Sequence, residues 1–326
     1  VTLWQLCLIA FMPTVAGLRL LWIGAFTMTR REKLLPSVVH NPPRRALLKT
    51  AFATAPMTLL AGGAVMSHAE ERRLQINRHR IAAPWLPDRL KGLTITHISD
   101  LHLGRLYRPD MLPQMIDAAN GLDSDIVVIT GDIVDVSNDM LDLALDAIAK
   151  LNHRHGLFMC IGNHDEIDNR PEFIRRVRLR FPLLINQRRS LRIGGESLTI
   201  AGVDYASRDE PVGWRRSHLL NVAATLHAYD RAADGPLIAL AHHPHTWDCL
   251  VDTGVPLTLS GHTHGGQIMF TPAGDPREIG VGQILFRYNR GFYRRNGTTL
   301  FVNSGVGNWF PLRFNAPAEI VQIQLV

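Results

Sequence analysis

Five short hydrophobic segments of this chain each end abruptly in a group of Asp, His or Asn residues. The segments are residues 93–98, 126–130, 157–161, 237–241 and 257–259. Short runs rich in apolar and β-branched residues predict buried strands of an α/β protein. Side chains that follow the carboxyl ends of such strands gather at one edge of the sheet, where α/β folds bind their ligands. We therefore expect five separate parts of the chain to meet at one point.

The groups that follow these strands supply imidazole, carboxylate and amide side chains but no thiolate. They are Asp100-Leu101-His102, Gly131-Asp132, Gly162-Asn163-His164-Asp165, His242-His243-Pro244 and Gly261-His262-Thr263-His264. This mixture of nitrogen and oxygen donors suits Mn, Fe or Zn better than a soft thiophilic site or an all-oxygen calcium site. Paired metals in hydrolases lie about 3.5–4 Å apart and need a bridging ligand, for which a carboxylate is suited. Asp132 is the natural candidate for that bridge.

Each group alone has a simpler structural interpretation. A single buried His after a strand is usually a core residue, and Gly-Asp or Gly-Asn pairs usually form turns. Five such groups at five consecutive strand ends argue against that interpretation for the set. His243 and His245 differ from the others, because they fit the lining of a pocket better than a place among the metal ligands.

In this order and at these separations, the motifs DLH, GDIVD, GNHD, AHHP and GHTHGGQ resemble those of the calcineurin-like metallophosphoesterase family. The resemblance covers residues 93 to about 325. The GHTHGGQ ending and residues 288–293 and 311–314 are also similar to membrane-associated bacterial phosphodiesterases, which include chlamydial-type UDP-2,3-diacylglucosamine hydrolases. The implied fold is α/β, a four-layer sandwich of two mixed β-sheets flanked by helices and preceded by N-terminal membrane segments.

The family pattern implies a role for each matching residue. It assigns two overlapping ligand sets: Asp100, His102, Asp132 and His264 for the first metal, and Asp132, Asn163, His242 and His262 for the second. His164 would stay unbound beside the substrate as a catalytic acid or stabiliser, with Asp165 orienting it. The cofactor would be two divalent ions, with Mn²⁺ favoured and Fe, Zn or Mg as alternatives. The nucleophile would be a hydroxide that bridges them.

The first 67 residues indicate a membrane anchor rather than a globular domain. Residues 1–29 contain an apolar stretch long enough to cross a hydrocarbon core of about 30 Å, and a buried hydrophobic hairpin is the alternative. Residues 30–49 form a basic loop with a twin-arginine-like motif at Arg44-Arg45, which also fits an ordinary positively charged loop. Residues 50–67 are a second, weaker hydrophobic segment. We expect a linker over 68–91 and the catalytic domain over 92–326.

Charge is divided unevenly along the chain. Residues 1–91 hold 13 basic and 4 acidic residues, whereas the remaining 22 basic and 25 acidic residues give the rest a net charge of −3. The basic part therefore favours contact with anionic lipids, and the acidic catalytic part argues against a nucleic-acid partner. Six cations between the apolar segments favour a cytoplasmic loop, and hence a bacterial inner-membrane protein with a periplasmic catalytic domain. A cytoplasmic-facing domain is the alternative.

The gaps between the predicted strands contain helix signals, and the end of the chain is β-rich. We expect helices over residues 111–119, 140–151, 172–179 and 218–226, and strands over 283–288, 299–302 and 319–325. Two sheets packed face to face with helices outside are the expected architecture. Clustered arginines over 175–180 favour a solvated helix face. Arg290, Arg294, Arg295 and Arg313 could instead grip phosphate.

These observations predict a membrane-associated phosphoesterase that cleaves a phosphodiester or pyrophosphate. The substrate is a phosphate ester, and a lipid-linked one such as UDP-2,3-diacylglucosamine is a candidate. That substrate requires a cytoplasmic-facing site, which conflicts with export. The alternatives are a phosphomonoesterase acting on phosphoproteins or wall polymers and, from another class, a noncatalytic envelope scaffold. The complete ligand set argues against the scaffold. Nothing in the sequence indicates an oligomeric state.

Overall fold

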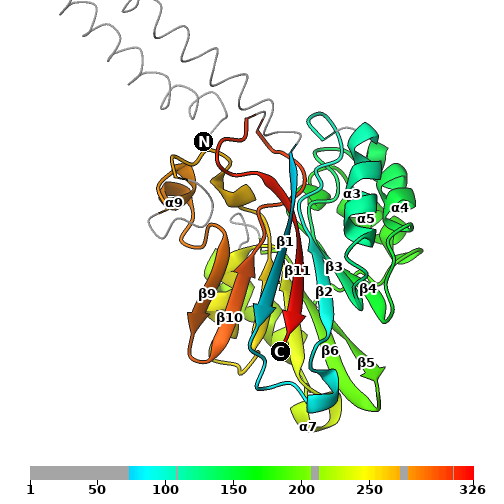
Figure 1. Cartoon of the computed structure of the whole chain (residues 1–326), viewed down its shortest axis with the longest axis vertical. Coiled ribbons are helices and arrows are strands. Elements are labelled where there is room, and N and C mark those ends of the chain that lie inside the picture. The colour runs from blue at the N-terminus through cyan, green and yellow to red at the C-terminus, as the bar shows by residue number, and fades with distance from the viewer. Residues whose placement is uncertain (1–72, 108, 207–212, 272–277, 311) are drawn as a thin grey trace, which may run out of the picture. The chain divides into compact units, whose positions relative to one another are not determined.

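The computed structural model describes residues 73–107, 109–206, 213–271, 278–310 and 312–326 (Figure 1). The predicted membrane segments 1–29 and 50–67, with the basic loop between them, lie outside the described residues. Within the described ranges, no helix is both long and apolar enough to cross a membrane.

The first sheet has five strands in the order β1-β11-β2-β3-β4. These strands are β1 (Leu74–Ile81), β11 (Ala318–Leu325), β2 (Thr94–Ile98), β3 (Ile126–Thr130) and β4 (Gly156–Cys160). β1 runs parallel to β11, β11 is antiparallel to β2, and β2, β3 and β4 are parallel to one another. The sheet is therefore mixed, and the carboxyl ends of β2, β3 and β4 lie at one edge.

The second sheet has six strands in the order β5-β6-β7-β8-β10-β9. These are β5 (Gln187–Ile193), β6 (Glu196–Val203), β7 (Leu237–Ala241), β8 (Leu257–Ser260), β10 (Thr298–Val302) and β9 (Gly291–Arg295). The four central strands β6, β7, β8 and β10 are parallel, and the edge strands β5 and β9 are antiparallel to their neighbours. This sheet is also mixed, as expected.

The two sheets pack face to face around one apolar core. Ile95, Val128 and Phe158 from the first sheet share a buried cluster with Leu240 and Leu259 from the second. Burial of such side chains contributes about 25 cal/mol per Å² of apolar surface removed from water. The sheets therefore hold their strand ends in a fixed relation to each other.

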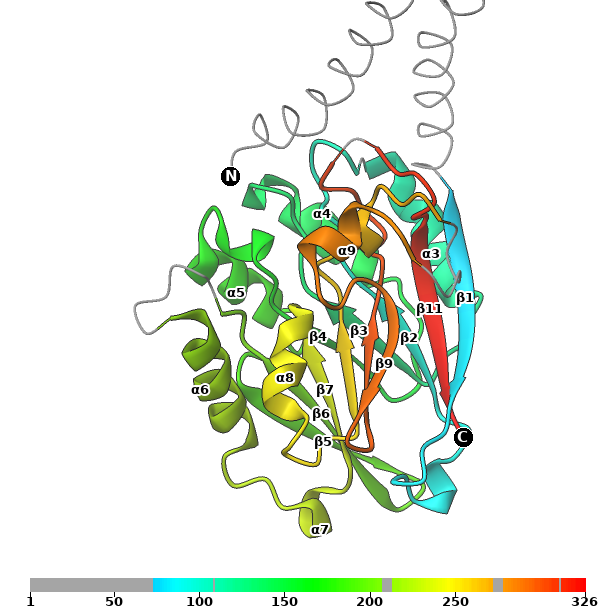
Figure 2. The same cartoon turned by 90° about the vertical axis from the view of Figure 1, so that its left-hand side faces the viewer.

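Helices cover the outer face of each sheet (Figures 1 and 2). α3 (Leu112–Asn120), α4 (Leu141–Ile148) and α5 (Arg170–Arg178) cover the first sheet through the core residues Met115, Leu145 and Phe173. α6 (Trp214–Leu226) and α8 (Trp247–Leu250) cover the second through Val222, Trp247 and Leu250. The short helices α7 (Arg231–Asp234) and α9 (Val281–Leu285) complete the set of α-helices among the described residues. The expected four layers are therefore present.

Most predicted elements match the structure within a few residues, but two do not. Residues 283–288 were expected to form a strand, and this prediction is wrong because Val281–Leu285 is the helix α9. The expected linker over 68–91 contains β1, which pairs with β11 along its whole length, so the sheet begins before the predicted boundary at residue 92. β5, β6 and β9 were not predicted.

The shared core between the sheets predicts a stability effect at Leu240. Leu240→Ala should lower the free energy of unfolding by about 2–5 kcal/mol, because the cavity it leaves is enclosed by both sheets. Chemical denaturation followed by circular dichroism measures this loss. Leu219→Ala, on the exposed side of α6, is the control and should change stability by at most about 0.5 kcal/mol. Equal losses in the two variants would contradict this account of the core.

Candidate metal centre

The predicted ligands lie in tight turns that directly follow the strands. Five of them have a positive backbone φ, between 46° and 75°: Asp100, His102, Asp132, His262 and His264. Non-glycine residues adopt this left-handed conformation at a cost of about 1–3 kcal/mol, and such residues cluster at functional sites. The turns therefore hold strained residues whose side chains all point into one small volume.

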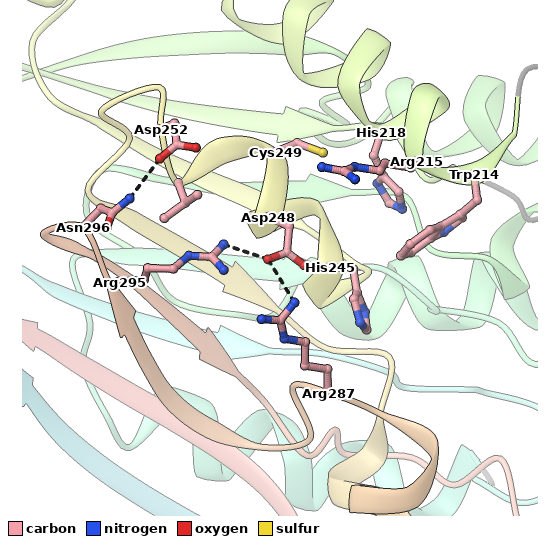
Figure 3. Close-up of a pocket in the computed structure, with 11 residues that line it drawn as sticks. Trp214, Arg215, His218, His245, Asp248, Cys249, Asp252, Arg287, Arg295 and Asn296 are labelled. Carbon is pink, nitrogen blue, oxygen red and sulfur yellow. Dashed lines mark hydrogen bonds and ion pairs between the residues drawn. The ribbon is translucent and has the colours of Figure 1, made fainter.

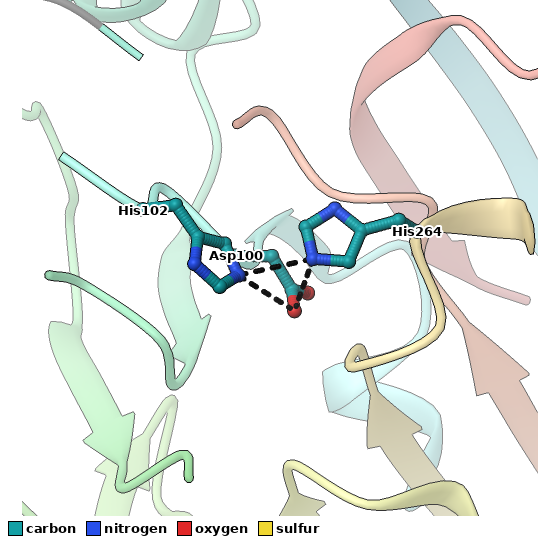
Figure 4. Close-up of side chains that lie close together, drawn as sticks. All are labelled: Asp100, His102 and His264. Atoms are coloured by element: carbon teal, nitrogen blue, oxygen red, sulfur yellow. Dashed lines mark hydrogen bonds and ion pairs between the residues drawn. The ribbon is translucent and has the colours of Figure 1, made fainter. Parts of the chain in front are cut away.

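The first group of side chains contains Asp100, His102 and His264 (Figure 4). The two Nε2 atoms of His102 and His264 are 3.0 Å apart. Asp100 Oδ1 lies 3.4 Å from His264 Nε2 and 3.9 Å from His102 Nε2. Asp132 Oδ2 approaches the same atom of His102 to 3.3 Å. These are the four residues expected to bind the first metal.

The second group contains His242, His262 and Asn163. His242 Nε2 lies 3.2 Å from His262 Nδ1. Asn163 Oδ1 lies 3.1 Å from His242 Nε2 and 2.9 Å from His262 Nδ1. Asp132 Oδ2 is 3.1 Å from His242 Nε2. The structure thus brings together all seven predicted ligands, with one carboxylate oxygen of Asp132 between the two groups.

The hydrogen bonds on the far side of two imidazoles indicate that these groups suit a metal. His242 Nδ1 donates to the carbonyl of Thr130 at 2.7 Å, and His264 Nδ1 donates to the carbonyl of Gly307 at 3.2 Å. With the proton assigned to Nδ1, the lone pair of Nε2 points into the centre in each ring. Lone pairs and carboxylates that converge in a buried space need a cation between them, so the donor set fits a divalent metal pair.

The two central carboxylates show the same need for positive charge. Burial favours the neutral form of Asp132, but His242 and His102 outweigh it and hold its pKa well below the ordinary value. For Asp100, burial raises the pKa of the carboxyl group, and the negative charge of the neighbouring Asp132 raises it further. His242 lowers this pKa, but its effect is smaller than that of burial. Two buried carboxylates this close are ionised together only when cations balance them.

Glycine is required where the ligand turns approach one another. A Cβ atom on Gly261 would lie 2.2 Å from Asp100 Oδ2, and one on Gly162 would lie 2.2 Å from Asp132 Oδ1. Both distances are far below a van der Waals contact. The glycines of the GHTH and GNHD motifs therefore make room for the two central carboxylates.

His164 is more exposed than three of the predicted histidine ligands. Its side chain is 22% exposed, whereas those of His102, His242 and His264 are 0–2% exposed. Its Nδ1 lies against the carbonyl oxygen of Asp135, and its ring stands edge-on to the ring of His102 at 4.4 Å. It also lies close enough to His102 and Asp132 to join a metal-binding group.

The expectation that Asp165 orients His164 is not met. The Asp165 carboxylate accepts hydrogen bonds from the backbone N–H groups of Asp132 (2.9 Å), Ile133 (2.8 Å) and Gly162 (2.9 Å). Asp165 therefore ties the turn after β3 to the turn after β4. The group beside His164 is Asp135 instead, which also has a carboxylate oxygen 3.7 Å from His164 Nδ1. Its position five residues after a strand end gave no signal in the sequence.

Arg313 is buried behind the first group and does not face it as a phosphate-gripping side chain would. Its guanidinium donates to the carbonyls of Ser304 (3.0 Å), Gly307 (2.6 Å) and Ala316 (2.7 Å). Gly307 in turn donates its N–H to the carbonyl of Asp100 at 2.7 Å and accepts from His264. Arg313 therefore braces the loop that holds two ligands of the first group. The sequence drew attention to this arginine but suggested the wrong role for it.

Two more of the arginines that were noted, Arg290 and Arg295, have acidic partners within the chain. Arg290 pairs with Glu278 at 2.6 Å, and Arg295 pairs with Asp248 at 2.7 Å. On and just after α5, Arg175 and Arg180 pair with acidic residues on the surface, as expected of a solvated face.

A cavity of about 560 Å³ lies near the second group (Figure 3). Its lining includes Trp214, Arg215, His218, His245, Asp248 and Arg295. The buried ring of His243 stands between this cavity and the centre, 5.3 Å from the ring of Trp214 and 4.5 Å from that of His262. His243 and His245 thus belong to the surroundings of the centre, as the sequence suggested.

Comparison with protein families matches residues 93–266 to the calcineurin-like phosphoesterases. An uncharacterized metallophosphoesterase of Helicobacter pylori (strain J99) is 32% identical over 72% of this chain and 60% of its own length. The uncharacterized metallophosphoesterase YkuE of Bacillus subtilis is 30% identical over 86% of this chain and 97% of its own length. Phosphodiesterase YaeI of Escherichia coli is 24% identical over 87% and 99%, respectively. The chain thus spans only part of the Helicobacter relative.

The shared position of Asp132 predicts that its replacement affects both metals. Asp132→Asn should abolish turnover and lower the metal content of the protein at both sites, because one carboxylate oxygen faces both imidazole groups. Elemental analysis of the purified protein measures this. His264→Ala is the comparison and should empty mainly the first site. Two metals per chain in Asp132→Asn would refute the bridging position.

The bracing contacts of Arg313 predict an indirect effect on the first site. Arg313→Met should weaken Mn²⁺ binding about 10–100-fold while the protein stays folded, because the loop that positions Asp100 and His264 loses its donors. Metal titration together with circular dichroism separates this effect from unfolding. Arg294→Met, at an exposed position on β9, is the control. Unchanged Mn²⁺ affinity in folded Arg313→Met would contradict the bracing role.

Proposed function

This chain belongs to the calcineurin-like phosphoesterase family, and from that premise we propose that it hydrolyses a phosphodiester or pyrophosphate with two divalent metal ions. The observation that carries the proposal is the pair of donor groups that share Asp132. A single group would suit a structural metal, whereas two groups that share one carboxylate are the arrangement of two-metal hydrolases.

We propose that the residues divide between the two ions in the way that the family pattern implies. We assign Asp100, His102 and His264 to one ion and Asn163, His242 and His262 to the other, with Asp132 between them. When bound, the ions would lower the pKa of a water molecule and polarise the phosphoryl oxygens. The buried carbonyls of Thr130 and Gly307 keep His242 and His264 in the tautomer that binds metal. The described part of the chain needs to supply no nucleophile of its own.

His164 is our candidate for the residue that protonates the leaving group. Its side chain is 22% exposed, so a substrate at the centre can reach it. The Asp135 carbonyl accepts from Nδ1, which leaves Nε2 as the atom that gains and releases a proton.

We favour a diester or pyrophosphate over a monoester as the substrate. The name of the Escherichia coli relative, a phosphodiesterase, agrees with this preference. A phosphomonoesterase is the alternative, and the ratio of the two activities decides between them.

Attachment to a bacterial inner membrane and a lipid-linked substrate are further parts of the proposal, and they rest on the apolar and basic residues 1–67. The side of the membrane on which the domain lies selects the substrate class. A cytoplasmic domain fits UDP-2,3-diacylglucosamine, and a periplasmic domain fits exported lipids and wall polymers. A topology reporter fused after Val326 distinguishes the two.

The activity itself is tested with the purified full chain. Treatment with a chelator should abolish hydrolysis of a chromogenic diester, and added Mn²⁺ should restore it. A chromogenic monoester assayed in parallel should be the poorer substrate. If the metal-loaded protein hydrolyses neither the diester nor the monoester, a noncatalytic scaffold would be favoured.

The position of His164 predicts a rate loss that depends on the leaving group. His164→Ala should keep its full metal content and lose roughly 10²–10⁴ in rate on a diester with an alkoxide leaving group. The loss should shrink for nitrophenol, which leaves without protonation. Rates and metal content measured on the same preparation provide the check. Equal losses for all leaving groups would point to an electrostatic role, and loss of metal would make His164 a ligand.

A further inference from the structure

Three chain segments join into one apolar surface next to the metal centre. The backbone N–H of Phe270 donates to the carbonyl of Ile279 at 2.7 Å, and that of Met269 donates to the carbonyl of Phe314 at 2.9 Å. These bonds connect the segment after the GHTHGGQ motif to α9 and to residues 312–314. We call the exposed apolar residues on these segments the apolar platform: Phe270, Ile279, Ile284, Leu285 and Leu312.

Two residues of the platform are largely exposed to solvent. Ile284 is 84% exposed and Phe270 is 67% exposed. Other large apolar residues with high exposure among the described residues lie on separate elements, such as Leu179 at the end of α5 and Leu219 on α6. Contiguous exposed apolar residues mark surfaces that contact a partner or a membrane.

Hydrogen bonds and a ring contact connect the platform to the metal centre. The buried Gln267 follows His264 by three residues, and its side-chain amide donates to the carbonyls of Phe310 (2.8 Å) and Leu312 (3.0 Å). Phe286, the residue after α9, has its ring 5.9 Å from the ring of His262. A molecule that covers the platform therefore lies at the edge of the candidate active site.

The strand order places Leu74, the first residue of β1, at the end of the first sheet where the metal centre lies. Leu74 pairs with Ala318, and β11 runs antiparallel to β2 with Val321 opposite His97. Leu74 thus lies towards the end of the sheet where β2 leads into Asp100. Seven residue steps separate it from residue 67, and seven steps span at most about 25 Å. A membrane segment over 50–67 would hold this end of the domain near the bilayer.

We propose that the apolar platform docks onto the lipid bilayer surface and presents the metal centre to phosphate esters embedded there. The second part rests on the proposed function. Charge supports a bilayer over a protein partner, because residues 1–91 carry 13 basic and 4 acidic residues and attract anionic lipids. The acidic Glu278 beside the platform is paired with Arg290 at 2.6 Å, so this carboxylate does not face lipid unpaired.

Hydrogen–deuterium exchange of the full chain tests the docking. Backbone amides of residues 278–286 should exchange at least about 10-fold more slowly in vesicles of phosphatidylcholine and phosphatidylglycerol than in detergent. Ile284→Asp should lose this protection, since a buried charge opposes insertion. Leu179→Asp, at a 74% exposed position just after α5, should keep it. Equal exchange with and without vesicles would overturn the proposal.

Two other occupants of the platform have distinct signatures that would also overturn it. Protection that grows with protein concentration without lipid would mean that a second copy covers the platform. Protection in detergent at every concentration would mean that residues 1–67 cover it.

Hydrolysis of a soluble chromogenic diester, measured in parallel, separates this proposal from the proposed function. Wild type and both variants should be equally active on it, because neither residue lies at the metal centre. Protection from exchange without hydrolysis of the diester would support docking and contradict the proposed function. Full hydrolysis without protection would support the proposed function and contradict docking.

Discussion

The carboxylate of Asp132 is the group on which both halves of the candidate centre depend. One of its oxygens lies 3.3 Å from His102 Nε2 and 3.1 Å from His242 Nε2, and these imidazoles come from the first and the second sheet, respectively. Because ligands from both sheets meet at one carboxylate, the strand ends of the two sheets must keep fixed positions relative to each other. The apolar core between the sheets holds them in these positions.

The turns around Asp132 show how the chain accommodates this convergence. Five predicted ligands have left-handed backbone conformations, and glycines stand where a side chain would collide with the central carboxylates. The cost of these strained turns is offset by buried hydrogen bonds. Asp165 ties two turns together through three backbone N–H groups, and Arg313 braces a third loop from behind. A preorganised centre of this kind loses little free energy to reordering when metal binds.

The structure brings the predicted ligands together, whereas the sequence predicted the supporting groups poorly. Asp100, His102, Asp132 and His264 were identified because their motifs match the pattern of the family. Asp165 was expected beside His164, yet it binds backbone N–H groups, and Asp135 occupies the expected place. Arg313 was considered for phosphate binding, yet it is fully buried against carbonyls. Contacts to backbone groups leave no residue pattern, because every residue offers the same N–H and C=O.

The sequence by itself determined the fold class, the order of the central strands along the chain and the seven candidate ligands. Apolar runs that stop at Asp, His or Asn, together with motifs that match the family pattern, carry this information locally. Only the tertiary structure decided that β1 and β11 pair across 244 residues, that α9 is a helix rather than a strand, and that exposed apolar residues gather beside the metal centre. These features depend on which distant segments pack together, and a local pattern of hydrophobicity does not specify its partner.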